Sequence, residues 1–171
     1  MTVRDTQRAK VYDAEQLVRG VFDRADEHHT RAVELYGSQL TLPIERRFAS
    51  VESVQSYADK VLSLVWIRAR WSRAAVPVLV RARAGRTAAH YEPAEGVLAV
   101  PVHVGGTAWA LRELVVLHEL AHHLAPDAES VAPHGPEFCS RYIDLVDGVI
   151  GPEAALLLRT TMLGCGVRLG G

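Results

Sequence analysis

The stretch HELAH at residues 118–122 places two histidines four positions apart, with a glutamate between them. On a helix, residues i and i+4 share one face, so His118 and His122 would point their imidazoles in the same direction. Two neutral imidazoles at this spacing are a frequent ligand pair for zinc, and a carboxylate at the position of Glu119 can act as the general base that activates water. The stretch therefore predicts a metal-binding helix.

The flanking residues predict one buried helix over residues 107–125. Thr107 is a candidate N-cap, and Pro126 disfavours helical geometry at the residue before it. Apolar residues surround nearly the whole helix, a pattern typical of a buried one. A buried histidine is often a structural core residue, and this interpretation is the alternative to metal binding.

A third candidate ligand is His134, in the stretch HGPEF at residues 134–138. The intervening loop can turn the chain back, because each extended residue spans about 3.3–3.6 Å. Gly135 and Pro136 predict a helix start, since proline is well tolerated in the first turn. We expect His134 at the entrance of that helix to complete the site, with Glu137 as the alternative third ligand.

Other polar residues near these stretches are considered for structural or supporting roles rather than as ligands. His123 follows His122 but points roughly 100° away around the helix. It is interpreted as a surface residue or as a support for a ligand. Asp127 and Asp144 are candidates for orienting a ligand imidazole through a hydrogen bond.

The stretch HELAHH followed by HGPEF resembles the HExxH…HGxxF/W arrangement of SprT-like and related minimal zincins. It is also similar to a group of small metallohydrolase-like proteins from high-GC bacteria and their phages. The resemblance covers residues 97–142, and no zinc-ribbon cysteine motif follows, which departs from many SprT-like proteins. It implies a zincin-like core, a single Zn²⁺ held by His118, His122 and His134, and Glu119 as the catalytic acid/base.

We expect an α+β fold in which a zincin-like core, with a small mostly antiparallel sheet and the HExxH helix, follows N-terminal helices. A single domain is predicted for residues 1–171, with residues 1–65 as a helical N-terminal part and 66–164 as the catalytic core. The expected elements are a helix from Asp13 as N-cap to Gly37, a helix over 50–65, strands over 76–84, 87–92 and 97–102, and helices starting at Gly135 and Gly151.

The composition narrows the range of functions. The net charge is −1, so no overall field attracts nucleic acid or a membrane. Two cysteines make no disulfide framework, and the chain has neither a signal-peptide pattern nor an apolar run of membrane-spanning length, so a cytoplasmic location is expected. Between Asp59 and Glu92 the charged residues are all basic and tryptophans are interleaved. This stretch is a nucleic-acid-binding patch or, as the alternative, the solvated face of a strand.

The combined pattern predicts a zinc-dependent hydrolase, with a peptidase as the preferred assignment. A polypeptide substrate would add as a strand along a sheet edge, for which residues 97–102 are the candidate. Two alternatives stay open: a zincin-like zinc-binding module that acts as a binding or regulatory partner, possibly associated with DNA, and a hydrolase of non-peptide amides. Candidate oxyanion donors are His90, Tyr91, His103, Arg141 and Tyr142.

Overall fold

A computed structural model describes residues 3–84, 88–101, 111–126 and 131–170. The described chain is α+β, which confirms the predicted class at that level. The chain divides into two compact units, one made of residues 1–45 with 129–171 and the other of residues 46–128. The prediction of a single domain is not tested by this division.

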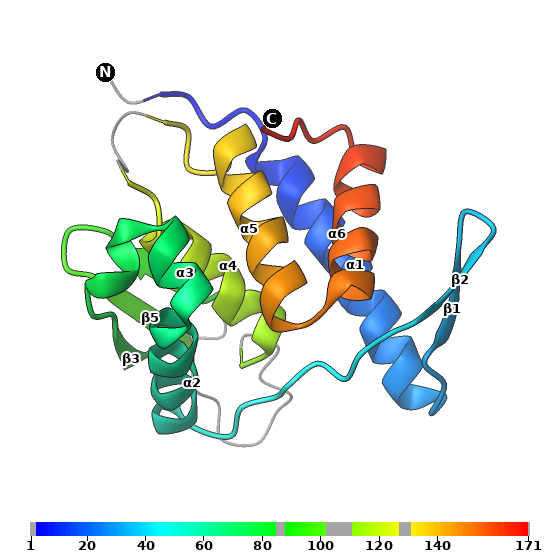
Figure 1. Ribbon diagram of the computed structural model, residues 1–171, viewed down its shortest axis with the longest axis horizontal. Helices are drawn as coiled ribbons and strands as arrows, with labels where there is room; N and C mark the ends of the chain where they lie inside the picture. Colours follow the sequence, from blue (N-terminus) through cyan, green and yellow to red (C-terminus); the bar gives the residue numbers. More distant parts are fainter. Residues whose placement is uncertain (1–2, 85–87, 102–110, 127–130, 171) are drawn as a thin grey trace. The chain divides into compact units, whose positions relative to one another are not determined.

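The first unit is built on three helices, α1 (Arg8–Glu27), α5 (Pro136–Val149) and α6 (Pro152–Gly164). Both α1 and α5 pack against α6, and the three helices lie side by side in Figure 1. The buried residues of α1 recur at helical spacing, as in Val11, Val18 and Phe22. Helix α5 begins with a proline after Gly135, and α6 begins with a proline after Gly151, so both starts are confirmed.

The predicted helix over residues 13–37 is wrong in its second half. Helix α1 starts earlier and ends at Glu27, and a hairpin of β1 (Ala32–Leu35) and β2 (Ser38–Thr41) follows. Tyr36 and Gly37 form the two-residue turn with φ of 49° and 80°, the left-handed geometry that tight hairpins require. Gly37 is thus a turn residue, and Asp13 lies exposed inside α1 with no capping role.

The second unit contains α2 (Val51–Ser63), α3 (Val65–Arg70), a short 3-10 helix η1 (Ser72–Ala75) and α4 (Glu113–His123). The helix predicted over residues 50–65 is confirmed as α2. Ser50 caps it, because its hydroxyl accepts from the Ser53 amide while the Ser53 hydroxyl accepts from the Ser50 amide.

The sheet of the second unit has the order β3-β5-β4, with β3 (Leu79–Arg83), β4 (His90–Glu92) and β5 (Val97–Pro101). β5 runs parallel to β3 and antiparallel to β4, so the described sheet is mixed rather than mostly antiparallel. The predicted hairpin between β4 and β5 is confirmed. The assignment of residues 97–102 to a sheet edge is wrong, because β5 is the central strand and all five of its residues are buried.

Helix α4 begins at Glu113 rather than near Thr107, which lies outside the described residues. The carbonyl of Leu111 accepts from the Phe48 amide and Arg112 forms an antiparallel bridge with Arg47, so the chain is extended immediately before the helix. The fully buried carboxylate of Glu113 accepts from the Arg46 amide at 2.9 Å. It also accepts from the Arg46 guanidinium and the Tyr57 hydroxyl, each at 2.7 Å. These bonds attach the start of α4 to the connector that precedes α2.

Candidate metal centre

Helix α4 presents His118 and His122 as an adjacent pair, one turn apart. Their Nε2 atoms are 3.2 Å apart and their ring centroids 4.9 Å. Two nitrogens at ordinary zinc distances in a tetrahedral site would lie about 3.3–3.4 Å from each other. His118 is buried and His122 is half-buried. The predicted sharing of one helix face is therefore confirmed, with a separation suited to a common ion.

His134 lies immediately before α5 and is 5% exposed. Its Nδ1 is 2.6 Å from Oδ2 of Asp5. Its ring packs against the ring of Tyr12 at 5.3 Å and that of Phe138 at 5.0 Å between centroids. Its carbonyl accepts from the Gln7 side-chain amide at 3.2 Å. The imidazole is thus held on several sides by its own unit.

The candidate ligand nitrogens of His118, His122 and His134 all lie within 4.8 Å of one another. This spacing is compatible with a metal site. Glu137, the alternative third ligand, is not part of the cluster and its side chain is exposed. Glu119 is 5% exposed and adjoins His118 on α4. Its catalytic role stays a prediction.

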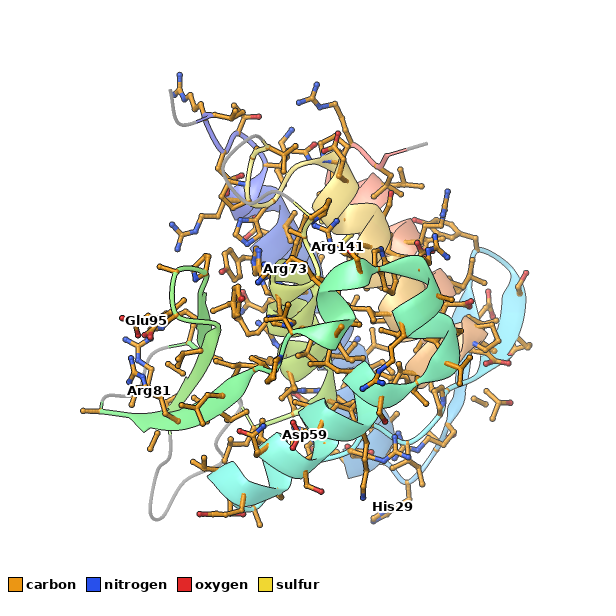
Figure 2. The ribbon with its side chains drawn as sticks, turned by 60° about the vertical axis from the view of Figure 1, so that its left-hand side comes forward. His29, Asp59, Arg73, Arg81, Glu95 and Arg141 are labelled. Atoms are coloured by element: carbon orange, nitrogen blue, oxygen red, sulfur yellow. The ribbon has the colours of Figure 1, made fainter. Side chains whose placement is uncertain are left out.

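His123 is a structural residue of the second unit. It is fully buried, and its Nε2 lies 2.9 Å from the Val76 carbonyl, to which it must donate. Nδ1 can then accept from the Tyr91 hydroxyl at 2.9 Å, while Arg73 (Figure 2) donates to the His123 carbonyl at 2.8 Å. Burial, assisted by the charge of Arg73, lowers the pKa of His123 and favours the neutral ring. The expectation of a surface residue is wrong.

Further candidates named from the sequence lie in different surroundings. Asp127 and His103 lie outside the described residues. Asp144 is half-buried on α5, and its suggested orienting role stays a prediction. Arg141 and Tyr142 are buried in the first unit, where burial and then Glu15 raise the pKa of Tyr142 well above its usual range. The phenol of Tyr142 is therefore protonated at neutral pH.

The basic stretch between Asp59 and Glu92 is largely engaged by its own unit. Arg81, at the outer side of the sheet in Figure 2, pairs with Glu92. Arg83 donates to the Ala88 carbonyl at 2.8 Å, and Arg70 lies over the Trp71 ring at 5.2 Å. These contacts favour the structural alternative, and nucleic-acid binding stays a prediction.

Sequence reasoning missed Asp5 and Gln7 as supports of the His134 segment. They are 129 and 127 positions away from it, and nothing in the local pattern around either residue indicates the pairing. Across the described ranges, no helix combines the length and apolar character needed to cross a membrane.

Comparison with known proteins finds no matching family model, no matching curated protein and no matching solved structure.

Proposed function

We propose that this protein is a zinc-dependent hydrolase of the zincin type, with peptide bonds as its substrate. In this proposal His118, His122 and His134 bind one zinc ion and Glu119 is the catalytic acid/base. The observation that carries the proposal is the cluster of three imidazoles. Glu119 lies on α4, the helix that supplies two of them, His118 and His122.

The donor set fits zinc. Three imidazoles with no thiolate match a catalytic zinc site, which keeps a fourth position open. The separation of 3.2 Å between the His118 and His122 nitrogens is close to that of two ligands in a tetrahedral site. Zinc held in this way would supply a Lewis acid and lower the pKa of water to about 7.

The protein's own groups would then perform the proton transfers. Glu119 takes a proton from the attacking water and passes it to the leaving amine. Its near-complete burial keeps bulk water from competing for that proton. The half-buried side of His122 is the proposed approach for water and substrate.

The substrate strand is proposed to add at an edge of the sheet. Since β5 is central, the available edges in the described sheet are β3 and β4. We favour β4, because it contacts α4, the helix that carries His118 and Glu119. Recognition through backbone groups would make the sequence preference of such a peptidase weak.

Metal analysis of the purified full-length protein tests the ligand set. We expect about one zinc ion per chain in the wild type, near zero in His118→Ala or His122→Ala, and strongly weakened binding in His134→Ala. His29→Ala is the matched control, since His29 is an exposed histidine far from the cluster in sequence, and it should keep its zinc. Full zinc affinity in His134→Ala, with loss in Glu137→Ala, would overturn the proposed third ligand.

Activity is tested on a library of fluorogenic peptides and on denatured casein. Glu119→Gln should retain zinc and lose turnover by at least about 100-fold, as expected for removal of a general base. Glu95→Gln, which changes an exposed glutamate, should keep wild-type turnover. Undiminished turnover in Glu119→Gln contradicts the mechanism. A wild type that binds zinc and cleaves neither substrate contradicts the peptidase assignment and favours the binding module.

A further inference from the structure

The segment just before α1 contacts the imidazole ring of His134 through the side chain of Asp5. Asp5 Oδ2 lies 2.6 Å from Nδ1 of His134, and the two side chains are 18% and 7% exposed. An ionised carboxylate can only accept a hydrogen bond, so Nδ1 must carry the proton. The lone pair then lies on Nε2, and a histidine that binds a metal through Nε2 needs this tautomer.

The same segment contacts the backbone of His134. The Gln7 amide nitrogen donates to the His134 carbonyl at 3.2 Å, while its oxygen accepts from the Arg168 amide at 2.7 Å. Gln7 is 4% exposed, so water competes little for these bonds. With Tyr12 and Phe138 against the ring, these contacts leave the imidazole little freedom to rotate.

Among the described residues, the second oxygen of Asp5 has no hydrogen-bond donor. Oδ1 is buried and accepts no hydrogen bond within the part of the chain that the structure describes. The contact of Oδ2 with Nδ1 of His134 is therefore the hydrogen bond that the described residues give to this carboxylate.

We infer that Asp5 is a positioning residue that holds His134 in the orientation and tautomer required of a metal ligand. The inference rests on the proposed zinc site and gives the N-terminal segment a defined part in it. Carboxylates that accept from ligand imidazoles strengthen metal binding, and their removal costs about 10–100-fold in affinity.

The test measures zinc affinity of the full-length protein by competition with a chromogenic chelator. Asp5→Ala should bind zinc about 10–100-fold more weakly than the wild type, and Asp5→Asn, of the same size without the charge, should also bind more weakly. Asp13→Ala, an exposed aspartate of α1, is the control and should bind as the wild type does. The visible spectrum of the Co²⁺-substituted protein gives a second readout, since a displaced His134 alters the ligand field.

A double-variant cycle separates positioning from general destabilisation. In a His134→Ala background, Asp5→Ala should cause no further loss of zinc affinity, because its only route to the metal has been removed. An equal loss in both backgrounds would overturn the inference. Wild-type affinity in both Asp5 variants, with weak binding in His134→Ala, would overturn it while leaving the proposed function standing. Unchanged affinity in His134→Ala itself would overturn the proposed ligand set and this inference together.

Discussion

The two segments that supply the clustered histidines are held in different ways. His118 and His122 share a face of α4 because of their spacing in sequence, and the helix needs only to form for them to lie together. His134 precedes a helix, and its ring and carbonyl are held by Asp5 and Gln7, more than 120 positions earlier in the chain. Local periodicity places the first pair, whereas contacts from the opposite end of the chain place the third histidine.

The largest expected effect is on the segment that contains α4. Glu113→Ala removes a fully buried carboxylate that accepts three hydrogen bonds, so we expect the free energy of unfolding to fall by about 3 kcal/mol. Urea denaturation measures it, with Glu52→Ala on the exposed side of α2 as a control that should stay within about 0.5 kcal/mol. Equal stabilities of the two variants would mean that α4 needs no long-range anchor.

The second prediction addresses the segment that contains His134. Gln7→Ala removes the acceptor of the Arg168 amide and the Gln7 donor to the His134 carbonyl, so we expect the free energy of unfolding to fall by about 2 kcal/mol. Gln16 is exposed on α1, the helix that follows Gln7, and Gln16→Ala should change the free energy of unfolding by less than about 0.5 kcal/mol. If both substitutions were neutral in urea denaturation, the N-terminal segment would not hold His134, and the contrast with α4 would disappear.

A pair of glycine substitutions sharpens the boundary between α1 and the hairpin. Gly37 has φ of +80°, so Gly37→Ala should lower the free energy of unfolding by about 1 kcal/mol although its Cβ would meet nothing within 4 Å. Gly20 lies inside α1, where a Cβ would make only an ordinary contact with Arg24 at 3.5 Å. Gly20→Ala should therefore raise stability by about 0.5–1 kcal/mol. If thermal denaturation shows that both substitutions shift the melting temperature in the same direction, this boundary is contradicted.

The last prediction, with the smallest expected effect, concerns the reactivity of the Cys139 thiol, which lies next to His134. Cys139 is fully buried, and this burial raises its pKa to about 12. The thiol should therefore stay protonated and unmodified by iodoacetamide in the native protein, while half-buried Cys165 is labelled. Mass spectrometry of the labelled peptides measures this. Rapid native labelling of Cys139 would show that the segment around His134 opens readily.

Much of the fold could be predicted wherever the signal is local. The Ser50 start of α2, the proline starts of α5 and α6, and the hairpin of β4 and β5 all depend on residues close together in sequence. The hairpin of β1 and β2 is also local, but the helical spacing of its apolar residues led to the wrong prediction of a continuing helix. The error in the sheet arose where distant segments decide. In the mixed sheet β5 is central because β3 pairs with the edge of β5 that β4 leaves open. The apolar run of β5 is compatible with an edge strand or a central strand, so the sequence did not decide between them.

By itself, the sequence determined that two imidazoles share one helix face and that His134 stands at the entrance of a helix. Both follow from backbone periodicity and capping, which act over a few residues. Only the tertiary structure decided that His123 is a buried scaffold residue and that Asp5 accepts from His134. The physical reason is that hydrogen bonds between distant segments form only when packing of the whole unit offsets the entropy of bringing those segments together.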